Sequence, residues 1–257
     1  MNTLPVIIPY FKDPIALEKN KEVLKSLINI KVDLFVRDNS IDNILYTKAV
    51  NEGLRKYCFT KEYKYVMILN QDAYLSTDAV DQMILIMENN PKCGICTPIS
   101  IDDNNLVNWC GGLDVFPVGR HLSIPLNEIV LESLETYWSN GACMLMRTEM
   151  VREIGLLDEN MLFIFSDSDY SFTAVSRGWK NLVATKAFVK HSPSGSASVQ
   201  NNWLTEIKLK DQLYFAEKWL NGSLFKKISY EGQKLSDMTI KDHIRKIKNS
   251  ISLIQSI

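Results

Sequence analysis

The sequence predicts an α/β protein, with a mixed, mainly parallel sheet flanked by helices and followed by a helical C-terminal extension. Two observations lead to this prediction. Through residues 1–100, short apolar runs rich in β-branched residues alternate with longer stretches of helical periodicity, and this alternation is typical of parallel sheets. After residue 220 the composition changes to a basic segment with regularly spaced isoleucines, which favours a separate helical element.

The first half contains four predicted strands, each followed by a helix or a turn. The strands are expected at residues 4–9, 32–36, 65–69 and 94–99, and the helices at about 14–28, 45–57 and 78–90. Thr77 or Asp78 can cap the third helix, and Pro91 stops it. Because strand and helix alternate, we expect the strands to be parallel.

The second half, residues 101–220, has a less regular pattern. Gly- and Pro-rich turns dominate residues 106–126, and an apolar strand at 138–146 is interrupted by Asn140-Gly141. A helix at 167–177, a strand near 182–184, a Gly/Ser-rich loop at 192–198 and a helix at 203–220 complete this half. We expect a single domain over residues 1–220, in which residues 101–220 shape a pocket.

The C-terminal segment, residues 221–257, forms the predicted extension. Residues 226–257 hold seven Lys or Arg against three Asp or Glu. Five isoleucines follow one another in steps of four and three: Ile240, Ile244, Ile247, Ile251 and Ile254. This spacing fits an oligomerisation seam, a helix lying on an anionic bilayer, or a helix packed back on the main domain.

Charge and cysteine content exclude several classes of protein. The formal net charge of -1 gives no overall attraction to nucleic acid or to a membrane. No apolar run reaches the length of a membrane-spanning helix, and no signal peptide precedes the first strand, so we expect a cytoplasmic protein. The chain has five cysteines, and Cys93-Gly-Ile-Cys96 is interpreted as thiols packed in a strand rather than as a zinc or redox site.

Polar residues follow three of the predicted strands: Pro9 and Tyr10, then Asp38 and Asn39, then Asn70, Gln71 and Asp72. Ligands of an open parallel sheet bind beyond the carboxyl ends of its strands. A departing diphosphate needs its charge neutralised, which a divalent cation held by carboxylate oxygens can do. Asp72 is the best candidate ligand, and residues 1–100 are interpreted as a nucleotide-binding half. The alternative is that each polar residue only caps a helix or turn.

A second group of candidates lies at the predicted helix start near residue 167. Asp167 and Asp169 fall in its first turn, where the helix dipole favours carboxylates. One of them can act as a general base toward an acceptor hydroxyl, and an ordinary N-cap is the alternative. His191 follows a predicted strand and can complete a metal site.

Two tryptophans are candidate platforms for a sugar ring. Trp109 precedes Gly111 and Gly112, and Trp138 precedes Asn140-Gly141. Both can instead fill the core, as tryptophans more often do.

Taken together, these segments resemble the inverting glycosyltransferases of family 2, in particular the rhamnosyltransferase-like and galactofuranosyltransferase-like branch. The resemblance covers about residues 4–198. It implies the Rossmann-like glycosyltransferase-A fold. The motifs that carry it are Val6 to Tyr10, Arg37 to Ser40, Asn51-Glu-Gly53, Leu69 to Asp72, Ser139 to Leu145, Ile154 to Glu159, Phe163 to Tyr170, Gly178-Trp179 and His191.

The resemblance implies a role for each of these motifs. Pro9, Tyr10, Asp38 and Asn39 would contact the nucleotide, Asn70, Gln71 and Asp72 the diphosphate and metal, and Asn140 and Gly141 the donor sugar. Asp167 would be the catalytic base and His191 a second metal ligand. Asn51 to Gly53 would form the family's Asn-x-Gly turn. Trp109, Gly111, Gly112 and Asp169 are expected at the sugar or the acceptor.

Two residues depart from the family pattern. Asn70 stands where many relatives have the first acid of the metal motif, which would at most weaken metal binding. Ser166 stands where a Glu usually precedes the base, and the loss of a negative neighbour would lower the pKa of Asp167 or alter acceptor binding. Neither change removes the base.

The sequence thus predicts a metal-dependent, inverting hexosyl- or deoxyhexosyltransferase that uses Mn²⁺ or Mg²⁺. The donor would be a UDP-sugar, or next a dTDP-sugar, and the acceptor a glycan, lipid-linked or glycoprotein hydroxyl, as in polysaccharide biosynthesis. Through its C-terminal helix the protein is expected to form a homo-oligomer or to contact a membrane surface. Nucleic acid is not an expected partner. One alternative is a sugar nucleotidylyltransferase, although residues 9–13 lack the Gly-rich phosphate loop this would need. Another is a noncatalytic scaffold of the same fold.

Overall fold

The structure, a computed structural model, describes residues 2–112, 125–129, 132–191, 202–220 and 237–255. The expected loop at 192–198 lies outside these ranges. One sheet forms the centre, with the strand order β2-β1-β3-β8-β5-β9-β4, while β6 pairs with β5 and β7 with β9. The strands are β1 (Asn2–Tyr10), β2 (Ile30–Asp38), β3 (Tyr65–Leu69), β4 (Tyr74–Leu75), β5 (Cys93–Ile101), β6 (Val107–Trp109), β7 (Ser133–Glu135), β8 (Cys143–Arg147) and β9 (Lys180–Lys190).

The sheet is mainly parallel, as the alternation of strands and helices predicted. β1 pairs in parallel with β2 and β3, and β5 pairs in parallel with β9. Between the two groups lies β8, which is antiparallel to both β3 and β5. The long strands on either side of β8 therefore run in one direction, and their carboxyl ends open at the same edge of the sheet.

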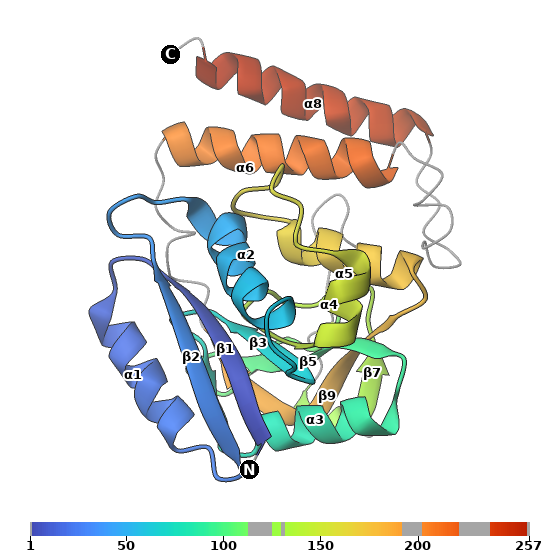
Figure 1. Cartoon of the computed structure of the whole chain (residues 1–257). Coiled ribbons are helices and arrows are strands. Elements are labelled where there is room, and N and C mark those ends of the chain that lie inside the picture. Colours follow the sequence, from blue (N-terminus) through green and yellow to red (C-terminus); the bar gives the residue numbers. More distant parts are fainter. Residues whose placement is uncertain (1, 113–124, 130–131, 192–201, 221–236, 256–257) are drawn as a thin grey trace.

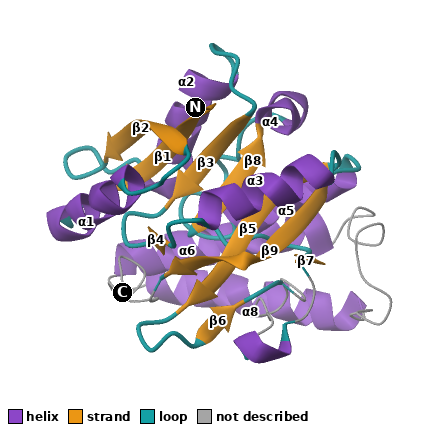
Figure 2. Ribbon diagram, turned by 90° about the horizontal axis from the view of Figure 1, so that it is seen from below, coloured by secondary structure: helices purple, strands orange, loops and turns teal. Residues whose placement is uncertain are grey.

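Helices cover both faces of this sheet (Figures 1 and 2). They are α1 (Pro14–Lys25), α2 (Leu45–Cys58), α3 (Ala79–Asn89), α4 (Thr148–Ile154) and α5 (Ser166–Ser176), with a short 3-10 helix, η1, at Leu126–Glu128. The alternation of strand side chains divides the core. In β3, Met67 and Leu69 pack with residues of α1 and α3, whereas Val66 and Ile68 pack with residues of α2, α4 and α5.

The C-terminal helices form a further layer. α6 (Asn202–Phe215) continues into a π-helical turn, η3 (Ala216–Leu220), and α8 (Asp237–Gln255) lies alongside α6 (Figure 1). Ile244 and Ile247 of α8 are only 8% and 4% exposed, and Lys248 pairs with Glu217 at 2.9 Å. This part of the isoleucine face is thus covered within the chain. Among the helices that the structure describes, none has both the length and the apolar character needed to cross a membrane.

Several local predictions need correction. Asn51 to Gly53 lie inside α2 rather than in a turn. There α2 approaches β1 so closely that a Cβ at Gly53 would lie 2.6 Å from Ile7. β9 is longer than predicted because Lys186, which interrupts its apolar pattern, is exposed and pairs with Glu132 at 3.2 Å.

The cysteines follow the packed-thiol interpretation. All five are free and buried. Cys93 and Cys96 lie in β5, and burial raises the pKa of the Cys96 thiol well above its usual value. A neutral, enclosed thiol is neither a reactive nucleophile nor an open metal ligand.

Candidate active site

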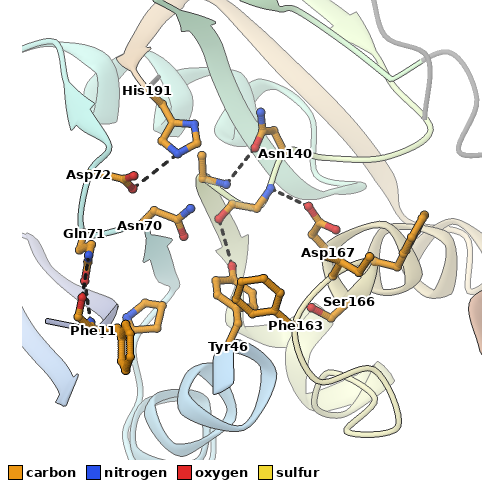
Figure 3. Close-up of a pocket in the computed structure, with 15 residues that line it drawn as sticks. Phe11, Tyr46, Asn70, Gln71, Asp72, Asn140, Phe163, Ser166, Asp167 and His191 are labelled. Carbon is orange, nitrogen blue, oxygen red and sulfur yellow. Dashed lines mark hydrogen bonds and ion pairs between the residues drawn. The ribbon is translucent and has the colours of Figure 1, made fainter. Parts of the chain in front are cut away.

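A pocket of about 310 Å³ opens at the carboxyl edge of the sheet. Its walls come from the ends of β1, β3 and β9, from the segment before β8, and from the loop that leads into α5 (Figure 3). The lining residues are Pro9, Phe11, Tyr46, Asn70, Gln71, Asp72, Asn140, Gly141, Ala142, Phe163, Ile164, Phe165, Ser166, Asp167 and His191. Six of the predicted nucleotide and donor-sugar contacts, together with the predicted base and the second metal ligand, therefore share one cavity.

Asp72 and His191 face each other on one side of this pocket (Figure 3). Asp72 Oδ1 lies 3.5 Å from His191 Nε2. Their side chains are 26% and 18% exposed, so both can reach a ligand in the cavity. His191 follows β9, where its backbone N–H donates to Ile101 and its carbonyl accepts from Asn108.

This pair fits a divalent cation. A carboxylate oxygen and an imidazole nitrogen at this separation can both lie about 2.0–2.2 Å from one ion, as metal–ligand bonds require. In the described part of the chain, no group of three or more His, Cys, Asp or Glu residues is arranged for a metal. Two protein ligands leave coordination positions for phosphate oxygens and water, as is usual for a cation that binds with its substrate.

Buried amides hold the turn that carries Asp72. Asn20 of α1 is fully buried, and its Nδ2 donates to the carbonyls of Asn70, Gln71 and Ala73 at 2.9, 3.3 and 3.0 Å. The Gln71 side chain accepts from the backbone N–H of Phe11 at 2.6 Å and donates to its carbonyl at 3.2 Å. The ends of β1 and β3 are therefore fastened to each other beside Asp72 and His191.

Asp167 lies across the pocket from Asp72 and His191 (Figure 3). Its Oδ2 accepts from the backbone N–H of Gly141 at 2.9 Å, and its Oδ1 accepts from that of Ser168 at 2.8 Å. Burial raises the pKa of Asp167, and the hydrogen bonds from Gly141 and Ser168 oppose this effect. A carboxylate with a raised pKa and a fixed orientation is suited to general-base catalysis.

Gly141 is required where it is because of the close approach of Asp167. A Cβ at this position would lie 2.9 Å from Asp167 Oδ2. Tyr46, in the first turn of α2, donates from its hydroxyl to the Gly141 carbonyl at 3.0 Å. The segment before β8 is therefore held on one side by Tyr46 and bonded on the other to the candidate base.

The structure places Asp169 outside the pocket, although it was expected at the sugar or the acceptor. Its carboxylate is 2% exposed, pairs with Lys218 at 2.8 Å and accepts from Trp219 Nε1 at 2.7 Å. Residues two apart on a helix point in nearly opposite directions, so Asp167 and Asp169 do not share a face. Asp169 joins α5 to the C-terminal helices.

Trp109, Gly111 and Gly112 also lie apart from this pocket. Trp109 is 2% exposed and packs against Trp138, with ring centroids 5.7 Å apart. A Cβ at Gly112 would lie 2.2 Å from the Trp138 indole. In this structure the two tryptophans fill a core cluster beside β5 and β6, which is the alternative that their residue type favoured.

Three of the predicted nucleotide contacts lie near the pocket without lining it. Asp38 is exposed at the end of β2, where its Oδ1 accepts from Ser40 N–H at 2.8 Å and this bonding lowers its pKa. Asn39 is buried, and its N–H donates to the carbonyl of Tyr10 at 2.8 Å. Asp38 forms the local turn that the alternative interpretation expected, at the same sheet edge as Pro9.

Sequence reasoning missed several aromatic residues of the pocket, among them Phe11, Tyr46 and Phe163. Phe11 directly follows a predicted strand, and Phe163 belongs to the aromatic run before Asp167. Their proximity to polar candidates was an available signal. Tyr46 offered none, because the role of its hydroxyl depends on a segment far away in the sequence.

Comparisons with known proteins give a fold. No family model and no curated protein sequence matches the chain. The structure of GalNAc-T7 with UDP, GalNAc and Mn²⁺ is similar, with a TM-score of 0.59 and 12% identity over 98% of this chain, which spans 57% of that protein's crystallised chain. The Staphylococcus aureus TarS 1–349 structure gives a TM-score of 0.56 and 12% identity over 97% of this chain and 71% of that one.

A third structure, A197 from STIV, matches 75% of this chain with 14% identity and a TM-score of 0.50. Identities this low describe architecture alone. The chain has the glycosyltransferase-A fold, with a mainly parallel central sheet between helices and a helix at the C-terminus.

Proposed function

We propose that this chain is a metal-dependent, inverting glycosyltransferase that moves a sugar from a nucleotide-sugar donor to an acceptor hydroxyl. One observation carries the proposal: Asp72 and His191, which are close enough to share a cation, and an oriented carboxylate, Asp167, lie on two sides of one pocket. Sugar transfer needs both groups, because a diphosphate leaves from one side of the anomeric carbon while a hydroxyl attacks from the other.

Asp72 and His191 would hold the divalent cation, Mn²⁺ or Mg²⁺. When bound, it would supply the Lewis-acid stabilisation of the departing diphosphate. Asp167 accepts the proton of the acceptor hydroxyl at one carboxylate oxygen. The N–H groups of Gly141 and Ser168 keep that carboxylate in place without neutralising it.

The carboxylates of the pocket support the inverting mechanism. Among the described lining residues, Asp72 and Asp167 are the only acids. With Asp72 assigned to the cation and Asp167 to the proton, neither of these two acids would serve as the nucleophile of a covalent glycosyl intermediate. A single displacement inverts the configuration of the donor, and a product that retains it would disprove this mechanism.

Several finer assignments rest on the resemblance to family 2 glycosyltransferases and its rhamnosyl- and galactofuranosyltransferase-like branch. A UDP-sugar is the first donor to test and a dTDP-sugar the second. The UDP and Mn²⁺ in the GalNAc-T7 structure support this order. The acceptor would be a hydroxyl of a glycan, a lipid-linked sugar or a glycoprotein.

The direct test measures nucleotide release from UDP-, GDP- and dTDP-sugars, with Mn²⁺ or with a chelator, for the native chain and Asp72→Ala. Metal-dependent release from one donor, lost in the variant, would establish the transferase. Release of pyrophosphate from a sugar phosphate and a nucleoside triphosphate would instead indicate a nucleotidylyltransferase. If no donor is turned over with any candidate acceptor, the result would favour a noncatalytic scaffold.

A further inference from the structure

One face of α6 contacts the loop that leads to the candidate base. Lys208, Asp211 and Phe215 follow one another in steps of three and four, so they share this face. The loop between α4 and α5 rises against α6 (Figure 1). Lys208 Nζ lies 5.6 Å from the centroid of the Phe163 ring, and Phe163 lines the pocket.

Asp211 makes the central contact of this face. Its side chain is 1% exposed, Oδ1 accepts from the N–H of Leu162 at 2.9 Å, and Oδ2 accepts from those of Phe163 and Ile164 at 2.7 and 2.9 Å. Burial raises its pKa, and the three amide bonds oppose this. A buried carboxylate that binds three successive amides fixes the path of the backbone through them.

The other side of this loop and its end are fixed as well. The Leu162 carbonyl accepts from the backbone N–H of Thr47 in α2 at 3.1 Å. Phe165, just before α5, has a φ of 65°, a left-handed conformation that is strained for an aromatic residue. Its ring stacks on Phe215, with centroids 5.0 Å apart. Strain of this kind persists only where the surrounding structure enforces it.

We propose that Asp211 is a positioning residue, which sets the pocket wall at 162–164 and, through it, the start of the helix that carries Asp167. The inference rests on the proposed function. Asp211 is not among the residues that line the cavity. Its effect on transfer would therefore pass through the loop.

Asp211→Asn tests this inference. The asparagine side chain has nearly the same volume, but its NH₂ group replaces one of the acceptor oxygens and would face a backbone N–H, which is also a donor. The control is Ile247→Ala, which leaves a cavity in the same helical layer but removes no hydrogen bond from the loop. Three quantities are measured for each variant: hydrogen exchange of the amides of residues 162–164, kcat, and KM for the donor that the native chain uses.

Asp211→Asn should speed exchange at these amides and lower kcat by about tenfold or more, since small misplacements of a catalytic group are costly. Its donor KM should change little, because Asp72 and His191 lie across the pocket. Ile247→Ala, compared at a temperature equally far below its Tm, should change none of the three quantities. Unchanged exchange, an unchanged kcat, or an equal loss of kcat in the control would overturn the inference. If the native chain turns over no donor, the proposed function fails, and exchange alone decides whether Asp211 holds the loop.

Discussion

Replacement of Gly141 by alanine tests whether the position of Asp167 sets the rate. Gly141 is not among the residues with a positive φ, so its backbone suits alanine. The new Cβ would lie 2.9 Å from Asp167 Oδ2 and 3.3 Å from its Cγ, whereas ordinary contact begins at 3.4 Å. The carboxylate must therefore move by about 0.5 Å, the difference between 3.4 and 2.9 Å.

This displacement predicts a loss of kcat of about tenfold. A misplacement of about 1 Å costs about 100-fold in rate, and half of that displacement corresponds to about 1.4 kcal/mol of transition-state stabilisation. The prediction concerns kcat at saturating donor, because Gly141 also lines the pocket and a methyl group there can change the donor KM as well. The assay is initial-rate nucleotide release over a range of donor concentrations, with the acceptor saturating.

Gly53→Ala is the matched control. Its Cβ would lie 2.6 Å from Ile7, in the core between α2 and β1 and outside the pocket. Overpacking of this kind costs about 1–3 kcal/mol of folding stability, so the variant should lower Tm while its folded fraction keeps the native kcat. A native kcat for Gly141→Ala, in an enzyme that Asp167→Asn inactivates, would refute the reasoning.

Three further predictions concern the same site and its supports. Because the pKa of Asp167 is raised and only its ionised form accepts a proton, kcat should fall as pH falls through a pKa above that of an ordinary aspartate; a pH–rate profile with no acid limb would contradict this. Asn20→Ala should weaken Mn²⁺ binding in a metal titration and lower the unfolding free energy by about 1–3 kcal/mol, since three carbonyls lose their donor. Lys218→Met should lower the unfolding free energy by on the order of 3 kcal/mol in chemical denaturation, because Asp169 would be left buried without its cation. If the variant is as stable as the native chain, this ion pair does not stabilise the fold.

The sheet was predictable because its side chains alternate between two buried faces. In β3, each residue is buried, and the strand reads as one continuous apolar run. β9 was recognised only in part, since Lys186 looks like the end of a strand in sequence, although β9 continues past an irregularity there and pairs with β5 again from Phe188 to Lys190. The place of Asn51 was not predictable either: its hydrogen bonds to Leu157, at 2.9 and 3.0 Å, join segments that only the folded chain brings together.

The site was predictable to the extent that strand ends define it. Asp72, Asp167 and His191 meet in one pocket because the carboxyl ends of the strands and the segment before α5 open at one edge. The partners of Asp169, Lys218 and Trp219, were not predictable, because they lie about 50 residues further along the chain. Asp211 gave no signal at all, because a single acid in a helix is ordinarily exposed.

Ser166 changes how the basicity of Asp167 should be understood. In the family 2 glycosyltransferases that the sequence resembles, a glutamate is expected at this position, and its absence by itself would lower the pKa of Asp167. Burial acts in the opposite direction, and the net shift of the Asp167 pKa is upward. Ser166 is itself 2% exposed at the start of α5, so a larger acidic side chain there would need both space and a partner for its charge. The upward shift of the Asp167 pKa therefore comes from burial and needs no acidic neighbour.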